Sequence, residues 1–390
     1  MQSEILPDIP LGLYIHFPWC VQKCPYCDFN SHAQKAALPQ AKYTQALITQ
    51  FRALKKATNG RTIETVFIGG GTPSLIQPQY IQNLLDVIRS EADVVDDVEI
   101  TLEANPGTLD ESHFAGYLKG GVNRLSIGVQ SFNNAQLKKL GRIHDAGKAH
   151  EAITLAKQVG FTRINIDLMY GLPSQTLAMA QQDLSTALAA DVEHISLYQL
   201  TIEPNTQFAV KPPTLPNSER CWDMHLALMP LLEEAQYDRY EVSAFAKKNQ
   251  ACRHNLNYWN FGDYLAIGAG GHAKLSQQTD EELKIQRYWN KRHPKAYIEA
   301  ADSGSFIGGD NEVPEADRTF EFLMNSLRLK QGFDTRNYPT RTGLSESQLQ
   351  QVTSPFIERG WLEEDGNCVR PTEEGYRYID EMLLTTLPQK

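Results

Sequence analysis

Residues 11–30 read LGLYIHFPWCVQKCPYCDFN, a short apolar run followed by a loop with three cysteines. The run at 11–17 has the length and composition of a buried strand in a parallel sheet. The loop places Cys20, Cys24 and Cys27 within eight residues, although the whole chain of 390 residues has only six cysteines. So few cysteines exclude a disulfide scaffold. The C-x3-C-x2-C spacing instead predicts a metal or iron–sulfur site at the end of the first strand.

Strand-like and helix-like segments alternate from this strand up to about residue 200, which indicates parallel β/α units. We expect strands at 11–17, 65–68, 98–102, 124–129, 163–168 and 194–200, and helices at 40–56, 79–89, 111–118, 148–159 and 177–189. Six such units can form a doubly wound sheet or an incomplete barrel, and periodicity does not separate the two. In both architectures the ligand site lies at the carboxyl ends of the strands.

Polar or glycine-rich turns follow five of the expected strands. They are the cysteine loop, then GGGTP at 69–73, EANP at 103–106, QSF at 130–132 and DLMYGLP at 167–173. Stability alone does not require such turns at five successive strand ends. We therefore expect these turns to converge on one site.

The rest of the chain differs in composition. A proline-rich stretch at 203–216 interrupts the alternation and predicts a linker or lid. A helix at 219–234, an aromatic-rich segment at 252–272, a helix at 345–359, a hairpin within 362–369 and a last helix at 372–384 are expected beyond it. The last three resemble a winged helix in outline. We therefore divide the chain into a core at 1–202, an extension at 203–305 and a C-terminal domain at 306–390.

The charge balance excludes some classes of partner. The chain has 37 Lys and Arg residues against 47 Asp and Glu, a formal net charge of −10, which argues against general nucleic-acid binding. No apolar run approaches the roughly 18 residues of a membrane span, so we do not expect this chain to be an integral membrane protein. Residues 1–7 lack the basic and apolar regions of a secretion signal. The expected location is cytoplasmic.

The three thiolates suit either zinc or an iron–sulfur cluster. Zinc would take His16 or His32 as a fourth ligand. A 4Fe–4S cluster on three cysteines would instead leave one iron open to a small molecule. The spacing favours the cluster, because the cysteines of zinc sites usually come as two pairs.

The cysteine loop and four later segments together resemble the radical S-adenosylmethionine (SAM) superfamily. YIHFP at 14–18 and the segments at 69–73, 103–106, 128–132 and 167–173 are similar to its anaerobic coproporphyrinogen III oxidase branch. CPYCDFN at 24–30 and HNLNYW at 254–259 resemble the heme chaperones of that branch. The resemblance extends over nearly the whole chain. It implies an α/β fold, an incomplete (β/α)6 barrel with a C-terminal extension and a small winged-helix-like domain.

The resemblance also implies the cofactors and their ligands. A 4Fe–4S cluster would bind Cys20, Cys24 and Cys27, with Tyr26 beside it, and one or two SAM molecules would bind near the open iron. The implied SAM contacts are Tyr14, Gly70, Gly71, Thr72, Glu103, Gln130, Arg142 and Asp167. Glycine has no Cβ, so a run of glycines lets the backbone approach a ligand closely. The alternative interpretation of this run is a plain strand-to-helix turn. A carboxylate in isolation would be interpreted as a helix cap, and its position at a strand end favours a ligand contact.

His254 begins the HNLNYW segment and is the candidate heme ligand. Heme iron takes an axial His or Cys within an aromatic pocket, and Tyr258, Trp259 and Cys252 lie nearby in sequence. The alternative is a hydrogen-bonded packing histidine. The basic segment KRHPK at 291–295 is either a solvated helix end or a docking site for a partner or for heme propionates.

The function that the resemblance implies is a heme chaperone, which delivers heme to client hemoproteins such as respiratory enzymes. The alternative is a coproporphyrinogen III oxidase. That oxidase has a further cysteine where this chain has Phe29, and a longer segment than the ten residues before the first strand here. Both differences favour the chaperone. The resemblance further implies a homodimer and peripheral membrane association, and a zinc-binding interaction module is the third interpretation.

Overall fold

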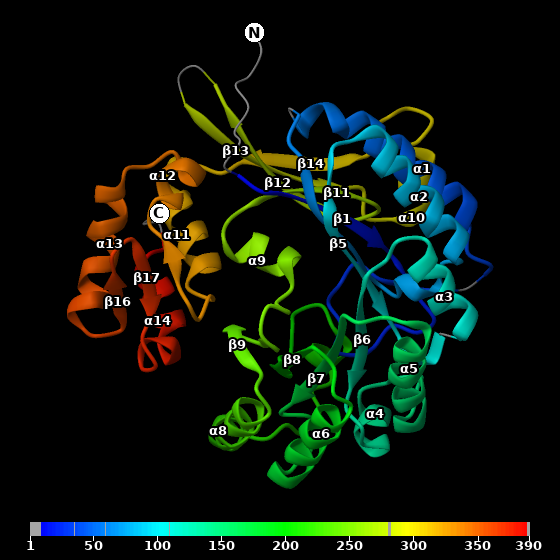
Figure 1. The fold of residues 1–390 in the computed structure, drawn as a ribbon, viewed down its shortest axis with the longest axis horizontal. Coiled ribbons are helices and arrows are strands. Elements are labelled where there is room, and N and C mark those ends of the chain that lie inside the picture. Colours follow the sequence, from blue (N-terminus) through cyan, green and yellow to red (C-terminus); the bar gives the residue numbers. More distant parts are fainter. Residues whose placement is uncertain (1–8, 35, 59, 109, 280–281, 388–390) are drawn as a thin grey trace.

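The computed structural model describes residues 9–387 apart from 35, 59, 109, 280 and 281 (Figure 1). Residues 1–7, examined above for a secretion signal, lie outside the described part. Within the described ranges, no helix is long and apolar enough to cross a membrane.

One curved sheet of twelve strands organises most of the molecule. Six parallel strands form its centre in the order in which the chain visits them: β1 (Leu11–Phe17), β4 (Ile63–Gly70), β5 (Val94–Ala104), β6 (Arg124–Gln130), β7 (Ile164–Tyr170) and β8 (His194–Gln199). All six predicted strands are confirmed. A doubly wound sheet would reverse its strand order near the middle, so the uninterrupted order identifies the incomplete barrel.

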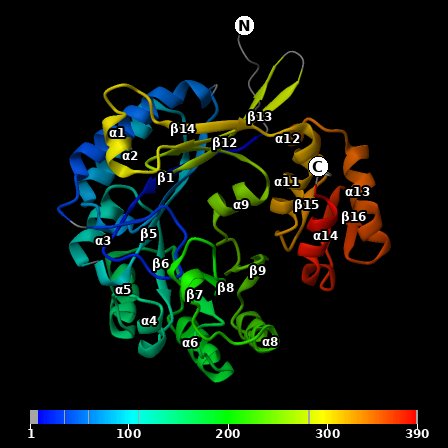
Figure 2. The same cartoon turned by 180° about the vertical axis from the view of Figure 1, so that it is seen from behind.

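Helices cover the convex face of this sheet (Figures 1 and 2). They are α1 (Gln40–Leu54), α2 (Pro78–Glu91), α3 (Glu111–Lys119), α4 (Asn134–Lys139), α5 (Ala146–Val159) and α6 (Leu177–Ala189). Five of them confirm the predicted helices to within two residues at either end, and only the short α4 was not expected. Helix α2 shows why they form, because its buried residues Ile81, Leu84, Leu85 and Ile88 make one apolar stripe against the strands.

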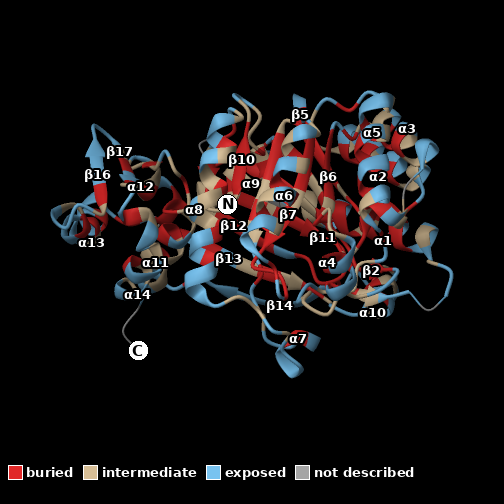
Figure 3. Ribbon diagram, turned by 90° about the horizontal axis from the view of Figure 1, so that it is seen from below, coloured by how far each residue is buried: buried red, intermediate tan, exposed pale blue. Residues whose placement is uncertain are grey.

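Short elements complete the connections within the core. They are β2 (Trp19–Cys20), β3 (His32–Ala33), and 3₁₀ turns at Lys55–Thr58, Pro73–Leu75 and Pro106–Thr108. The pairing of β2 with β3 closes the two ends of the cysteine loop. Figure 3 shows that buried residues are concentrated on the strands and on the inward sides of the helices.

The extension adds strands to both edges of the core sheet. At one edge, β11 (Asp263–Ile267) pairs parallel with β1, and β12 (His272–Gln278), β13 (Leu283–Asn290) and β14 (Ile307–Glu312) continue antiparallel. At the other edge lie β10 (Ala244–Ala246) and β9 (Asp238–Glu241). Its helices are α7 (Gln207–Val210), α8 (Ser218–Glu234), α9 (Arg253–Trp259) and α10 (Pro294–Glu299). Helix α9 crosses the concave side of the sheet (Figure 1).

The C-terminal part packs around a second apolar core that includes Phe322, Tyr338 and Phe356. Its elements are α11 (Glu315–Ser326), β15 (Phe333–Asp334), α12 (Asn337–Thr342), α13 (Glu346–Glu358), β16 (Leu362–Asp365), β17 (Cys368–Pro371), a 3₁₀ turn at Gly375–Arg377 and α14 (Ile379–Thr385). The predicted helix at 345–359 and the hairpin after it are confirmed.

The continuous last helix predicted at 372–384 is wrong. The Thr372 hydroxyl accepts a hydrogen bond from the backbone N–H of Gly375 at 3.0 Å, which fixes a turn in place of a first helical turn. Gly375 also packs against the backbone of Trp361 so closely that a side chain would not fit there. The segment is therefore divided into a 3₁₀ turn and the short helix α14.

Candidate cofactor site and the adjoining cavity

Two adjoining cavities lie on the concave face of the sheet, where alternate residues of each strand are exposed to the interior. The first, of about 390 Å³, lies over β4 to β8 and the cysteine loop, and we call it the core cavity. The second, of about 570 Å³, lies over β1 and β11 to β13, and we call it the extension cavity. Four residues line both and form the wall between them: Phe29, Gly70, Glu103 and Trp259.

All three cysteines of the loop line the core cavity. The Cys27 N–H donates to the Cys24 carbonyl at 3.1 Å, so a tight turn presents the last two thiols together. Burial raises the pKa of the Cys20 and Cys27 thiols. In the described part of the chain, no three His, Cys, Asp or Glu side chains converge closely enough to hold one metal ion. Three soft sulfur donors around a shared cavity fit the chemistry of an iron–sulfur cluster.

The two histidines considered as zinc ligands differ, because His16 has both ring nitrogens engaged whereas the buried Nε2 of His32 has no hydrogen-bond partner among the described residues. His16 bonds the Tyr14 hydroxyl through Nδ1 and the Asn30 carbonyl through Nε2, each at 2.9 Å, so both ring nitrogens are engaged. The His32 ring packs edge-on against His293, with 5.6 Å between the ring centroids. The structure therefore does not assemble the alternative Cys3His zinc site through His16.

The glycine-rich turn after β4 packs directly on the cysteine loop. Gly70 has φ of +115°, and a Cβ there would meet the imidazole of His16. A Cβ on Gly71 would lie 2.5 Å from the Trp19 carbonyl oxygen. The N–H groups of Gly71 and Thr72 donate to the carbonyls of Phe17 and Trp19, each at 2.7 Å. The glycines are thus needed for this close backbone packing, and all three residues of the turn also line the core cavity.

Two buried carboxylates lie on the inner face of the strands. Glu103 accepts a hydrogen bond from the Gly70 N–H at 3.0 Å. Burial raises the pKa of Glu103 to about 8, and the negative charge of Asp167 contributes to the rise. Burial also raises the pKa of Asp167, although hydrogen bonds from Asn165 and Ser196 oppose it. Such carboxylates gain from a bound cation or a hydroxyl donor, because either one stabilises their charged form.

Arg142 connects strand β6 to the cysteine loop. Its guanidinium donates to the Gly128 carbonyl at 2.6 Å, and it lies 3.5 Å from the Tyr26 hydroxyl and 3.7 Å from Cys24 Sγ. Gln130 ends β6 with φ of +70°, a conformation that costs energy for a residue other than glycine and is common in binding sites. Its Oε1 accepts from the Tyr198 hydroxyl at 2.7 Å.

The structure therefore brings twelve of the expected site residues to these cavities, eleven to the core cavity and one to the extension cavity. The core cavity receives Cys20, Cys24, Cys27, Tyr26, Gly70, Gly71, Thr72, Glu103, Gln130, Arg142 and Asp167. Tyr14 lines the extension cavity instead, beside Gly70 and Glu103. These placements leave the predicted ligand roles as predictions.

Several polar residues that lie within strands β6, β7 and β8 were not among the site residues expected from sequence. The core cavity is also lined by Arg124, Ser126, Asn165, Ser196 and Tyr198. A signal was available, since polar residues alternate with buried apolar ones along β6, β7 and β8. Parallel strands that are covered on both faces are apolar throughout. The alternation therefore indicates that one face of this sheet borders a solvent-filled or ligand-binding cavity.

His254 lies outside both cavities, packed between α9 and the sheet. Its Nδ1 bonds Thr65 Oγ1 at 2.8 Å and its Nε2 bonds the Tyr258 hydroxyl at 2.9 Å. Burial lowers its pKa to about 3, so the ring is neutral. Glu99 accepts hydrogen bonds from the backbone N–H groups of Arg253 and His254 at 3.1 and 3.0 Å, which anchors the start of α9. His254 thus has the surroundings of a packing histidine, whereas Tyr258 and Trp259 of the same motif line the extension cavity.

The family comparisons match the two parts of the fold. Residues 14–187 match the radical SAM superfamily, and residues 313–378 match the HemN C-terminal domain. The structure is similar to that of coproporphyrinogen III oxidase (HemN) from Escherichia coli, with a TM-score of 0.81 over 97% of this chain and 90% of that one. At 22% sequence identity, this likeness shows a shared fold.

Full-length relatives are closer in sequence. The chain is 46% identical to the heme chaperone HemW of Haemophilus influenzae over 385 residues, covering 98% of this chain and 99% of that protein. It is 44% identical to heme chaperone HemW of Escherichia coli, covering 96% and 97%. A mouse mitochondrial protein named radical S-adenosyl methionine domain-containing protein 1 is 33% identical, covering 97% and 87%. The chain therefore belongs to the radical SAM superfamily and, within it, to the HemW family.

Proposed function

We propose that this chain is a heme chaperone, which binds heme as cargo, passes it to client hemoproteins and carries a SAM-binding 4Fe–4S cluster. The observation that carries the proposal is the 46% identity, over 98% of the chain, to a protein named heme chaperone HemW. The geometry is consistent with it, because a large aromatic cavity adjoins the cysteine-lined one.

The proposed cluster binds Cys20, Cys24 and Cys27. When bound, a 4Fe–4S cluster supplies an iron with an open position and transfers single electrons. We place SAM in the core cavity, where the turn at Gly70, Gly71 and Thr72 lies against the loop. Of the remaining proposed contacts, Glu103 and Asp167 accept hydrogen bonds, while Arg142 keeps the loop against β6. Tyr14, Tyr26 and Gln130 complete the set.

The proposal is tested by heme transfer. Protein reconstituted under anaerobic conditions is titrated with heme, and the complex is then mixed with an apo-cytochrome. We expect a saturable Soret band on binding and its conversion to the cytochrome spectrum on transfer. Absence of binding, or binding with no transfer to any apo-hemoprotein offered, would contradict the proposal.

An oxidase assay separates the chaperone from the coproporphyrinogen III oxidase alternative. The reduced protein is incubated with SAM and coproporphyrinogen III, and we expect no protoporphyrinogen. Phe29, which replaces the further cysteine of the oxidase, lies 58% exposed between the two cavities. Its thiol-free side chain is consistent with a site that holds a tetrapyrrole without oxidising it.

The finer parts of the proposal concern partners and location. We propose respiratory hemoproteins as clients, a homodimer as the working form and a cytoplasmic location with peripheral membrane association. Co-purification from solubilised membranes, light scattering of the reconstituted protein and cell fractionation test these three statements separately.

A further inference from the structure

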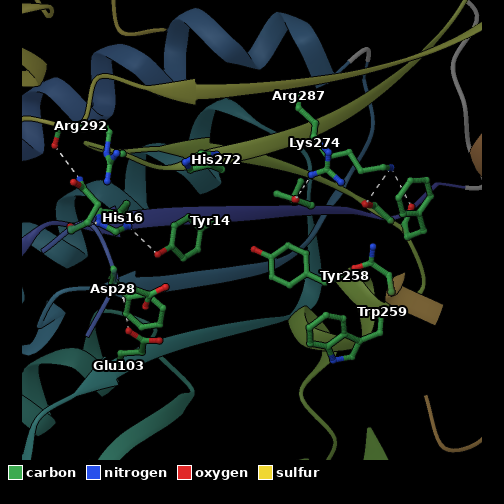
Figure 4. A pocket seen from close by; sticks show the side chains of 18 residues that line it. Tyr14, His16, Asp28, Glu103, Tyr258, Trp259, His272, Lys274, Arg287 and Arg292 are labelled. Atoms are coloured by element: carbon green, nitrogen blue, oxygen red, sulfur yellow. Dashed lines mark hydrogen bonds between the residues drawn. The ribbon is translucent and has the colours of Figure 1, made fainter. Parts of the chain in front are cut away.

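The extension cavity has the size and lining of a site for a large planar ligand. Its volume of about 570 Å³ lies within the range of roughly 300–1,000 Å³ that is typical of small-molecule sites. Six aromatic side chains line it: Tyr14, Phe29, Tyr258, Trp259, Phe261 and Tyr264. Figure 4 shows Tyr14 and Tyr258 facing each other across the cavity, with Trp259 below.

Charge is distributed unevenly around this cavity. Arg292, His272, Lys274 and Arg287 lie along the side formed by β12 and β13, whereas Asp28 and Glu103 lie along the opposite side (Figure 4). A ligand with an apolar body and an anionic edge would therefore be oriented, with its anionic edge toward β12 and β13.

Two of the cations already have strong partners. Lys274 forms an ion pair with Asp263 at 2.8 Å, and Arg287 pairs with Glu321 and the Tyr264 hydroxyl. The Arg292 guanidinium has no hydrogen-bond or ion-pair partner among the described residues, whereas its backbone is hydrogen-bonded by the side chains of Asn30 and His32. Arg292 is thus the cation available to an anionic ligand.

The histidines near the cavity also differ in whether their ring nitrogens already have hydrogen-bond partners. His16 has both ring nitrogens engaged, and His254 is buried outside the cavity with both of its own engaged. His272 is exposed at the start of β12, lines the cavity and has no hydrogen-bond partner for its ring within the described ranges. Its ring stacks on Trp289, with 6.2 Å between centroids and 26° between planes, which limits its orientations.

We propose that heme occupies the extension cavity, with its iron bound by the His272 imidazole and a propionate beside Arg292. The inference rests on the proposed heme-chaperone function and gives that function a site. Partial desolvation by the cavity wall and the nearby charges of Arg292 and Arg287 lower the pKa of His272, which favours the neutral ring that iron requires. The planar macrocycle would lie among the aromatic side chains, which present apolar faces to it.

The HNLNYW motif then acts through its last two residues. Tyr258 and Trp259 reach the cavity, and the Tyr258 ring packs edge-on against Tyr264 at 4.5 Å between centroids. His254 fixes Tyr258 through the hydrogen bond of 2.9 Å to its hydroxyl. His254 is therefore a positioning residue in this proposal, and His272 is the iron ligand.

The first test compares three histidine variants of the reconstituted full-length protein. His272→Ala should weaken heme binding at least about tenfold, since even outer partners of metal ligands contribute 10–100-fold. Its Soret maximum should shift, and added imidazole should restore it. His254→Ala should keep the wild-type Soret position with a smaller loss of affinity. His150→Ala, a change of an exposed histidine on α5, is the matched control and should change neither.

The outcomes separate the two levels of the proposal. If the wild type binds heme and His272→Ala leaves both affinity and spectrum unchanged, the assignment of the ligand is wrong and the chaperone function stands. A shifted Soret band in His254→Ala but not in His272→Ala would also overturn the assignment of His272 as the iron ligand. If the wild type takes up no heme, the proposed function itself fails.

A second test addresses the propionate contact. The wild type should bind heme more tightly than heme dimethyl ester, in which both propionates are neutral. Arg292→Gln should reduce this preference. Lys295→Gln is the matched control, because Lys295 belongs to the same basic segment, is exposed and does not line the cavity. An unchanged preference in Arg292→Gln would overturn the orientation.

Discussion

The core cavity and the extension cavity share one face of one sheet and a wall of four residues, yet they are built differently. In the core cavity, polar side chains bond one another, as Ser126, Asn165 and Asp167 do. In the extension cavity, aromatic side chains dominate and Arg292 and His272 lack such partners among the described residues. Prearranged polar groups suit a small polar cofactor, whereas aromatic walls with available ligands suit a large cargo.

The largest expected effect separates the two cavities by removing a thiol. Cys24→Ala should abolish the iron–sulfur cluster, because the two remaining cysteines of the loop are too few to hold it. The fold should be kept. Iron, acid-labile sulfide and circular dichroism measure this. Relative to wild type, the variant should lose nearly all of its cluster but keep most of its heme affinity.

Cys368→Ala is the control for that variant, since this cysteine lies on β17 of the C-terminal domain. It should retain a full cluster. If Cys24→Ala also retained one, the assignment of the loop would be wrong. If it lost heme binding completely, the two cavities would not be separable in function.

The next effect concerns the wall between the cavities. Glu103→Gln should weaken SAM binding about 10- to 100-fold, because a hydrogen bond to a charged group contributes about 1.5–3 kcal/mol. A bound cation lowers the pKa of Glu103 from about 8, so wild-type affinity should rise with pH and level off above that value. The variant should show no such rise in isothermal titration across this range.

The same group predicts a pH dependence of stability. The folded state keeps the Glu103 proton up to about pH 8, whereas the unfolded chain releases it near the ordinary value of 4.5. Unfolding is therefore increasingly favoured between these values, so the Tm of Glu103→Gln relative to wild type should rise as pH rises through this window. Glu234→Gln, on an exposed position of α8, should show a constant difference. A constant difference for Glu103→Gln would contradict its raised pKa.

A smaller effect is expected where the turn after β4 meets the cysteine loop. Gly71→Ala would place a Cβ 2.5 Å from the Trp19 carbonyl oxygen, and backbone cannot yield as a flexible side chain does. We expect a loss of about 1–3 kcal/mol in the free energy of unfolding, measured by urea denaturation, and a lower cluster content. Gly147→Ala, near the start of α5, is the control and should be close to neutral. Equal effects of the two changes would argue against the tight contact.

The smallest effect tests the polar lining of the core cavity. Tyr198→Phe removes the hydroxyl that donates to Gln130 Oε1 at 2.7 Å. We expect a loss of about 1 kcal/mol in unfolding free energy and a modestly weaker SAM affinity, with unchanged heme binding. Tyr80→Phe, on the outer helix α2, should leave both affinities unchanged. A larger change in heme than in SAM affinity would contradict the division of labour between the cavities.

Local pattern was enough to predict the core of the fold and most of its cavity. Each strand of the barrel is continuous in sequence and is followed at once by its functional turn, so Gly71, Glu103 and Asp167 could be assigned from spacing and resemblance. Periodicity does not separate a barrel from a doubly wound sheet, so the resemblance implied the barrel and the uninterrupted strand order shows it.

The extension cavity could not be predicted in this way. His272 and Arg292 lie near the ends of β12 and β13, and their neighbours across the cavity come from β1, about 260 residues earlier. Which side chains meet there depends on strand register, which a single sequence does not reveal. The hydrogen bonds of the candidate heme ligand His254 also depend on tertiary packing, since its Nδ1 bonds Thr65 of β4, while its Nε2 bonds Tyr258 of its own helix α9.

The parallel pairing of β1 with β11 also has a consequence for synthesis of the chain. β11, its neighbour on one side, leaves the ribosome about 250 residues after β1. At roughly 5–20 residues per second, this edge of β1 stays unpaired for about 12–50 seconds. An unpaired strand edge is a template for aggregation, so this edge of β1 is an aggregation hazard during that interval. The extension cavity is complete only after that interval, so a new chain acquires its cysteine loop well before it can enclose a large ligand.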